Sequence, residues 1–414
     1  MKGRCRITGE KLTFCFDLGN QYVTGFSKKS DLHKFERSSL KVGMGKKSKL
    51  LQLYESYPPE KMYREYWYKS GINETMINEL KGIVQSAKDY VKLNDGETVL
   101  DIASNDGTLL KNYANGVKKI GIDPCNIAKN SKFYQNKNVK FSNDFFTKKN
   151  YLSLTKKKSK IITAIAMFYD LENPIKFLRD VKSILSKDGV GIIQIGYTPL
   201  MFASNEFGFI SHEHICYFTL KNINDLMKKT GLEIFNVTTN ETNGGSIRIY
   251  FCHKNSKKML SCPLNLLDIG SLNLQSLLNY EKILKLDKVL TYKKFTKKID
   301  KLKIKTINWL RDQKRKGKLV IGYGASTKGN VLLQYYNITQ DLIPYIADRM
   351  PAKHGLVTVG TNIPIISENE MRKKKPDYLL ALPWFFIKSF EEREKKLLNQ
   401  GTRFVLPLPD LKIR

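Results

Sequence analysis

Two carboxylates about twenty residues apart give this chain its clearest chemical signal. Asp101 ends an apolar run and opens the segment Asp101-Ile-Ala-Ser-Asn-Asp-Gly107, and Asp123 ends the next apolar run. A loop of small residues lets the backbone approach a ligand, and an acid after the second strand can accept hydrogen bonds from ribose hydroxyls. A loop that seats a pyrophosphate would carry glycines, but Ala103 and Asn105 stand in those places. The loop instead carries two carboxylates, Asp101 and Asp106, which suit a ligand with an ammonium group and a ribose, such as S-adenosylmethionine.

A further acidic segment, Asn143-Asp-Phe-Phe146, follows a predicted strand at 139–141. An acid followed by aromatic residues can bond an adenine amino group and stack on its ring. The same residues also suit a helix start with Asn143 or Asp144 as the N-cap. The residues predicted to hold S-adenosylmethionine are Asp101, Ala103, Ser104, Asn105, Gly107, Asp123, Pro124, Asp144, Phe145 and Ala166.

The segment Ser211-His-Glu-His-Ile-Cys-Tyr-Phe218 supplies acid–base groups after a predicted strand at 190–196. Ligands of doubly wound sheets lie beyond the carboxyl ends of the strands, so these side chains would face the methyl donor. An imidazole exchanges protons near neutral pH, and Glu213 would orient His214. A metal site and a structural pair are the alternatives, although the spacing of His212 and His214 differs from the i, i+4 pair of a zinc helix.

Two glycine-containing turns are candidate anion sites. Asn243-Gly-Gly-Ser-Ile-Arg-Ile-Tyr250 predicts a turn and a strand carrying Arg248, which either grips a phosphate or lies on the surface of a hairpin. Gly322-Tyr-Gly-Ala-Ser-Thr-Lys-Gly329 follows a strand and opens a helix, so Lys328 and backbone N–H groups are candidate phosphate donors. This second turn is not a P-loop, because no Ser or Thr follows the lysine.

Alternating strands and helices must position these groups. Apolar runs at 98–102, 119–123, 139–141, 161–166 and 190–196 predict parallel strands, and the segment from Thr108 onward predicts a helix after the first of them. Later runs, 232–237 and 246–252, predict an antiparallel edge. The fold class is therefore α/β, and a second strand–loop–helix–strand unit ends at an acid, Asp348. The predicted parts are a small N-terminal lobe at 1–70, a doubly wound domain at 71–254, a helical connector at 255–316 and a second Rossmann-like domain at 317–414.

Length and composition limit the class of protein. A chain of 414 residues exceeds one core, so two or three domains are expected. No apolar run is long enough for a membrane span, and the N-terminus lacks the apolar region of a secretory signal. We therefore expect a cytoplasmic protein with six free cysteines. The net charge of +32 would suit nucleic acid, but the lysines are spread over all segments without interleaved aromatics, which favours composition bias and attraction to an anionic substrate.

Several motifs together resemble the sugar C-methyltransferase family, over almost the full length. They are Tyr66-Trp-Tyr-Lys-Ser-Gly-Ile-Asn-Glu-Thr-Met76, Asp101-Ile-Ala-Ser-Asn-Asp-Gly-Thr-Leu-Leu110, Gly121-Ile-Asp-Pro124, His212-Glu-His214, Tyr217-Phe218, Asn243-Gly-Gly-Ser246, Gly322-Tyr-Gly-Ala-Ser-Thr-Lys-Gly-Asn330, Asp348-Arg349 and Leu382-Pro-Trp384. The resemblance implies an N-terminal zinc-binding lobe, a class I (Rossmann-like) methyltransferase domain dependent on S-adenosylmethionine, and a C-terminal Rossmann-like domain that helps hold a nucleotide-sugar. It implies methylation of a ring carbon of a deoxy keto-sugar: a base removes the proton beside the ketone, and the enolate attacks the methyl group.

The resemblance also assigns roles to residues. His214 is the implied general base, Glu213 its neighbour, and Tyr66 or Tyr68 the aromatic residues near cofactor and sugar. The residues predicted to bind the nucleotide-sugar are His212, Tyr217, Asn243, Arg248, Gly324, Lys328, Asn330, Asp348 and Arg349.

The departures from the family pattern change two expectations. The family's zinc lobe uses two C-x-x-C pairs, whereas this chain aligns Cys5, Thr8, Gly45 and Ser48 with the four ligands. One thiol cannot make a four-thiolate site, so we expect no zinc and no other metal. Ser211 and Met167 replace a tyrosine and a histidine that the resemblance implies. These two changes bear on the identity of the sugar, of the methylated carbon and of the group that stabilises the enolate.

The leading hypothesis is a carbon methyltransferase for a nucleotide-linked sugar of a surface glycan or a secondary metabolite. The alternatives are a methyltransferase that binds nucleic acid, favoured by the charge, and a non-catalytic subunit that binds S-adenosylmethionine or sugar, favoured by the lost family residues. The sequence makes no prediction of the oligomeric state.

Overall fold

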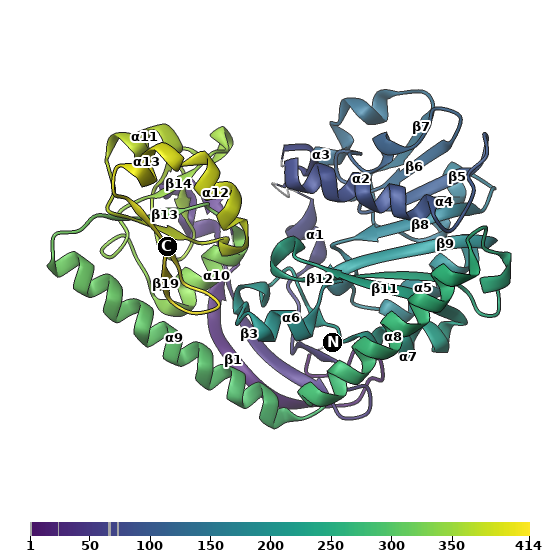
Figure 1. The fold of residues 1–414 in the computed structure, drawn as a ribbon, viewed down its shortest axis with the longest axis horizontal. Coiled ribbons are helices and arrows are strands. Elements are labelled where there is room, and N and C mark those ends of the chain that lie inside the picture. Colours follow the sequence, from purple (N-terminus) through teal and green to yellow (C-terminus); the bar gives the residue numbers. More distant parts are fainter. Residues whose placement is uncertain (1, 24, 65–67, 73) are drawn as a thin grey trace.

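The chain forms two α/β domains joined by an N-terminal lobe and a long helical connector. Figure 1 shows the central domain and the C-terminal domain side by side, with strand β1 (Leu12–Tyr22) curving through the lower part of the view between them and helix α9 (Val289–Arg315) running beneath the C-terminal domain. In this computed structural model the described residues are 2–23, 25–64, 68–72 and 74–414.

The central domain is built on a seven-stranded sheet in the order β11-β12-β9-β8-β5-β6-β7. The strands from β9 to β7 are parallel, and β12 and β11 complete an antiparallel edge, which confirms the predicted plan. The chain leaves β5 for β6 on one side and later returns to β8 on the other, so the carboxyl end of β5 faces the crevice where such sheets bind ligands. The strands are β5 (Thr98–Ile102), β6 (Lys118–Ile122), β7 (Val139–Ser142), β8 (Ser159–Ile165), β9 (Leu185–Gly196), β11 (Leu232–Asn240) and β12 (Ser246–His253).

Both faces of this sheet are covered by helices, which explains why its strands are almost wholly apolar. Val99 packs on one face with Leu80 and Ile83 of α2, while Leu100 packs on the other face in the same cluster as Leu178 of α5. Asn173 and a following proline start α5, and a capping box at Thr219 and a left-handed Gly231 bound α7. The helices are α2 (Glu74–Lys88), α3 (Asn126–Lys129), α4 (Lys148–Leu154), α5 (Pro174–Ile184), α6 (Thr198–Ala203) and α7 (Leu220–Thr230).

The predicted helix from Thr108 is wrong. The segment after the loop contains only a 3-10 turn, Leu110–Asn112, before β6 begins. The side-chain amide of Asn112 donates to the backbone carbonyls of Thr108 and Leu109, at 2.9 and 3.2 Å. These carbonyls would accept the next helical N–H groups, so the side chain competes with helix growth.

The N-terminal lobe is a four-stranded sheet in the order β1-β3-β4-β10. Its last strand, β10 (Cys216–Tyr217), comes from the segment that follows the His-Glu-His motif and pairs with β4. A second pairing, between β2 and β15, ties the lobe to the C-terminal domain. The lobe therefore contacts both domains. Its other elements are β2 (Phe26–Ser27), β3 (Arg37–Gly45), β4 (Leu51–Leu53) and α1 (Pro59–Tyr63).

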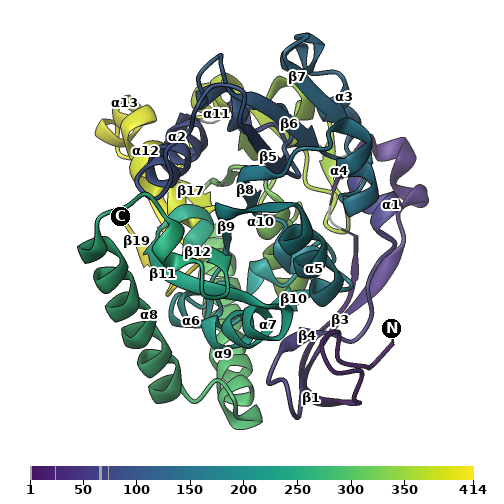
Figure 2. The ribbon, with the colours of Figure 1, turned by 90° about the vertical axis from the view of Figure 1, so that its right-hand side faces the viewer.

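Two helices, α8 (Leu264–Leu284) and α9, lead to the C-terminal domain, and Figure 2 shows them along one side of the molecule. That domain has a six-stranded sheet in the order β16-β14-β13-β17-β18-β19, parallel except for β19. Among the described residues, no helix combines the length and apolar character of a membrane span. The elements are β13 (Val320–Tyr323), α10 (Thr327–Tyr336), β14 (Ile346–Asp348), β15 (Val357–Thr358), β16 (Ile365–Ser367), α11 (Glu368–Lys373), β17 (Tyr378–Ala381), α12 (Ile387–Arg393), α13 (Lys395–Asn399), β18 (Arg403–Leu406) and β19 (Lys412–Ile413).

Candidate active site

The loop after β5 has an unusual backbone. Ala103, Asn105 and Gly107 have φ angles of 58, 49 and 80°, so every second residue is left-handed. Such a conformation is strained for alanine and is maintained by surrounding contacts. It bends the chain tightly at the end of β5 and brings the Asn105 N–H to the carboxylate of Asp123.

Asp123 organises this end of the sheet. Its Oδ2 accepts the backbone N–H of Asn105 at 2.8 Å, and its Oδ1 accepts that of Cys125 at 2.7 Å. Burial raises the pKa of Asp123, whereas these two hydrogen bonds lower it. Each oxygen keeps a lone pair, so the carboxylate can also accept from a ribose.

Asp101 lies deeper in the sheet. Its Oδ1 accepts the hydroxyl of Thr163 on β8 at 2.6 Å. Burial is the main cause that raises the pKa of Asp101 to about 7; the Thr163 hydrogen bond opposes this rise, and the charge of Asp123 adds to it. A carboxyl group poised near neutral pH would ionise when a cationic ligand arrives.

A single large cavity of about 1140 Å³ joins these groups to the rest of the molecule. Its wall comes from the N-terminal lobe, the central domain and the C-terminal domain. The predicted site residues that line it are Tyr68, Asp101, Ala103, Ser104, Asn105, Asp123, Pro124, Phe145, Ala166, Glu213, His214, Asn243, Gly324, Lys328, Asp348 and Arg349. Pockets for one small ligand measure roughly 300–1,000 Å³, so this cavity has room for a second ligand beside a methyl donor.

His214 is fixed by the segment that leads into β10. Its Nδ1 lies 2.8 Å from the backbone carbonyl oxygen of Phe209, and its ring stacks on the Phe209 ring and meets Tyr169 edge-on. An Nδ1–H that donates to a carbonyl leaves the lone pair on Nε2. Burial is the main cause that lowers the pKa of His214 to about 3; the hydrogen bond to Phe209 opposes this fall, and the charge of Lys328 adds to it. The imidazole is therefore neutral, and it lines the cavity as a proton acceptor.

A buried carboxyl pair stands beside this imidazole. Asp170 and Glu213 both line the cavity. Burial raises the pKa of Asp170 well above its ordinary value, and the charge of Glu213 raises it further. Tyr63 donates from its hydroxyl to the backbone carbonyl of Glu213 at 2.7 Å. The sequence predicted no role for Asp170 or Tyr63, because neither residue belongs to a recognisable motif.

The C-terminal domain contributes the opposite wall. Gly324 has a φ of 84°, and a Cβ there would meet the Pro383 ring at 2.7 Å. The Ser326 side chain caps α10, and Asp348 accepts the backbone N–H groups of Ala325 and Met350, both at 2.8 Å. Both oxygens of Asp348 are therefore engaged with the loop, which holds the start of α10 against the cavity.

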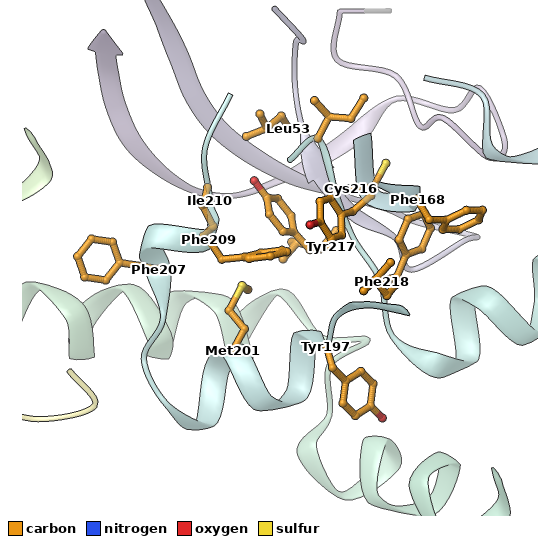
Figure 3. Close-up of a cluster of buried hydrophobic side chains, with 14 of the residues drawn as sticks. Leu53, Phe168, Tyr197, Met201, Phe207, Phe209, Ile210, Cys216, Tyr217 and Phe218 are labelled. Atoms are coloured by element: carbon orange, nitrogen blue, oxygen red, sulfur yellow. The ribbon is translucent and has the colours of Figure 1, made fainter. Parts of the chain in front are cut away.

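Several predicted residues are not brought to the cavity. His212 contacts the Ser38 carbonyl at 3.0 Å, Tyr217 lies among buried aromatic rings (Figure 3), and Asn330 donates to the Gly25 carbonyl at 3.3 Å. Arg248 pairs with Glu79 at 2.7 Å, so it is neither a free surface residue nor part of the cavity wall. The side chains outside the cavity wall are those of His212, Tyr217, Arg248, Asn330 and Asp144, together with Gly107. Tyr66 lies outside the described residues.

The positions aligned with a zinc site do come together, but they do not fit zinc. The Sγ of Cys5 lies 3.1 Å from the Oγ of Ser48, and Gly45 is next to both. The carboxylate of Glu10 accepts the backbone N–H groups of Lys47 and Ser48 and the hydroxyl of Thr8. One thiol with hydroxyl groups is not a zinc ligand set. Among the described residues, no three His, Cys, Asp or Glu side chains form a metal group.

Comparison with known proteins agrees with this geometry. A methyltransferase-domain family model matches residues 72–237, and a model for the C-methyltransferase C-terminal domain matches residues 241–409. The C-methyltransferase NovU of Streptomyces niveus is 25% identical over 368 residues, which cover 88% of this chain and 84% of that protein.

Solved structures align with about two-fifths of the chain. A S-adenosylmethionine-dependent methyltransferase from Clostridium acetobutylicum ATCC 824 is 13% identical, with a TM-score of 0.33 over 43% of this chain and 92% of that one. The plantazolicin methyltransferase BpumL, in complex with a pentazolic desmethylPZN analog and SAH, is 14% identical, with a TM-score of 0.35 over 44% of this chain and 87% of that one. The two family models lie in tandem and meet within the central domain, and the relative extends through both. The chain is therefore an S-adenosylmethionine-dependent methyltransferase, and it belongs to the C-methyltransferase family.

Proposed function

We propose that this enzyme methylates a ring carbon of a keto-sugar carried on a nucleoside diphosphate. The observation that carries the proposal is the shared cavity: one wall holds the Asp101 and Asp123 carboxylates, another the neutral imidazole of His214, and a third the start of α10. A methyl donor beside the carboxylates would leave the rest of the cavity for an anionic partner.

The residues divide the work as follows. Asp101, Asp123 and the Ala103–Gly107 loop hold S-adenosylmethionine, which supplies the electrophilic methyl group. His214 removes the proton beside the ketone through Nε2, since Nδ1 is tied to the Phe209 carbonyl. Arg349, which lines the cavity, and the N–H groups at the start of α10 attract the diphosphate. The product would serve a surface glycan or a secondary metabolite.

A direct assay tests this proposal. The purified enzyme is incubated with S-adenosylmethionine and a panel of nucleotide keto-sugars, and each is analysed by mass spectrometry. We expect one class to gain the mass of a CH₂ group, with the new carbon bonded to a ring carbon by NMR. His214→Ala should abolish the gain without weakening S-adenosylmethionine binding.

Other outcomes would contradict the proposal. Methylation of RNA or DNA, with binding that weakens steeply with salt, would favour the nucleic-acid alternative that the charge of +32 suggests. Tight binding of S-adenosylmethionine without transfer to any nucleotide-sugar would favour a non-catalytic subunit.

A further inference from the structure

Lys328 belongs to the C-terminal domain, yet its ammonium group lies against the central domain. Its Nζ donates to the backbone carbonyl of Asn243, and it lies 5.0 Å from the ring centre of Phe209 and 4.9 Å from that of Phe385. Aromatic faces hold a cation by their quadrupoles without neutralising it. Burial lowers the pKa of Lys328, whereas the charge of Glu206 raises it. The two rings and the carbonyl therefore fix the ammonium group in place.

The charge of Lys328 has no paired counter-ion in the described part of the chain. Glu206 is the carboxylate that acts on it electrostatically, but Glu206 accepts the indole N–H of Trp384 and makes no ion pair with the lysine. An ammonium group has three N–H donors, and the Asn243 carbonyl takes one of them. Because Lys328 lines the cavity, the other two are available to an oxygen of a bound ligand.

Phe209 links this cation to the general base. The ring of Phe209 stacks on the His214 imidazole, with centroids 4.2 Å apart, and also carries the Lys328 ammonium. The Phe209 backbone carbonyl accepts from Nδ1 of His214. Phe209 thus contacts both the proton acceptor and the cation, and all three residues line the cavity.

We propose that Lys328 is a catalytic residue whose ammonium group stabilises the negative charge that forms on the ketone oxygen of the substrate. The proposal rests on the proposed function. When His214 takes the proton, the C–H electron pair forms the C=C bond of the enolate, and the carbonyl π electrons move to the oxygen. That oxygen then faces the two remaining N–H donors of Lys328. Preorganised donors of this kind contribute most where water is excluded.

This role explains how a weak base can work here. The low pKa of His214 keeps the imidazole neutral but reduces its basicity, so an unassisted enolate would form rarely. A cation beside the oxygen stabilises the enolate, so it lowers the pKa of the C–H group beside the ketone toward the pKa of the imidazole. Since the cation and the base come from different domains, proton removal requires the C-terminal domain to be in place against the central one.

The test follows proton removal without methyl transfer. The full-length enzyme is mixed in D₂O with the keto-sugar nucleotide found in the product assay, and deuterium exchange beside the ketone is measured by NMR without S-adenosylmethionine. We expect Lys328→Met to slow the exchange by roughly 10²–10³-fold, with unchanged S-adenosylmethionine affinity by calorimetry. Lys374→Met is the matched control, because Lys374 lies over the Tyr345 ring outside the cavity.

A second variant separates charge from position. Lys328→Gln can still donate to the Asn243 carbonyl but carries no charge, so it should be as slow as Lys328→Met. Exchange at the wild-type rate in either variant would overturn the role of Lys328 while leaving the proposed function standing. A wild-type enzyme that neither exchanges the proton nor methylates any nucleotide-sugar would overturn both.

Discussion

The substitution Asp123→Asn tests the ribose contact and the loop structure together. The native carboxylate accepts two backbone N–H groups, one on each oxygen, at 2.8 and 2.7 Å. An amide keeps one acceptor and turns an NH₂ group toward the other N–H. The lost bond and the unsatisfied donor should lower the free energy of unfolding by about 1–3 kcal/mol.

The loss in cofactor binding should be of similar size. A hydrogen bond to an ionised acceptor contributes about 1.5–3 kcal/mol, and the variant loses the charge and one of the two oxygens that face a ribose. We therefore expect the Kd for S-adenosylmethionine to rise by roughly 10–150-fold. Titration calorimetry gives the Kd, and thermal unfolding gives the change in stability.

The control for this variant lies at the other end of the same strand. Asp95 is exposed, precedes β5 and does not line the cavity, so Asp95→Asn should change neither the Kd nor the stability. The reasoning is refuted if folded Asp123→Asn binds S-adenosylmethionine within about threefold of wild type, a difference below 1 kcal/mol. Asp123 would then hold the Asn105 loop without touching the ribose.

Three further results are expected. Because the pKa of Asp101 is about 7, about half of the Asp101 carboxyl groups are protonated at pH 7. Binding of cationic S-adenosylmethionine at this pH should therefore release roughly half a proton per enzyme. Calorimetry would detect the release as a binding heat that depends on the buffer and that disappears above about pH 8.5. Because His214 has a pKa of about 3, kcat/KM should not fall when the pH is lowered through the ordinary histidine pKa near 6.5. A clear inflection near that pH that His214→Ala removes would contradict the buried, neutral state of His214. The Glu10 carboxylate accepts two backbone N–H groups, so Glu10→Ala should lower the free energy of unfolding by about 1 kcal/mol. EDTA should leave the Tm of the wild-type protein unchanged, and a fall in Tm with EDTA would show a structural metal.

Local patterns in the sequence were enough to predict that Asp101 and Asp123 lie at the same edge of the sheet. Asp101 and Asp123 follow consecutive apolar strands, and parallel neighbours end at the same edge of a sheet, so their meeting could be predicted from spacing. Arg248 could not be placed in this way. It lies on β12, which pairs between β11 and β9, and its partner Glu79 is 169 positions away on α2. A long-range ion pair leaves no signal in the local sequence.

For the C-terminal wall of the cavity, too, the local sequence predicted only part of the arrangement. The glycine-containing loop before α10 predicted an anion site with Lys328 as a phosphate donor, and the structure does bring this lysine to the cavity. Its neighbours Phe209, Asn243 and Phe385 come from three distant segments. They fix the ammonium on the same Phe209 ring that stacks on the base, so the role that we propose for it depends on tertiary packing that the motif alone does not contain.

The two departures from the family pattern have different physical consequences. Ser211 is fully buried and does not line the cavity, so its hydroxyl cannot reach a ligand in this arrangement. Met167 does line the cavity, and a thioether neither donates nor accepts a proton at neutral pH. Among the described residues of the cavity wall, His214 is therefore the one imidazole, and it is the base of the proposed mechanism. Because the Ser211 hydroxyl lies outside the cavity wall and residue 167 is not a second imidazole, charge stabilisation in the proposed mechanism must come from elsewhere on the wall. Lys328 and the base share the contact with Phe209, and Lys328 is the cation that we propose for this stabilisation.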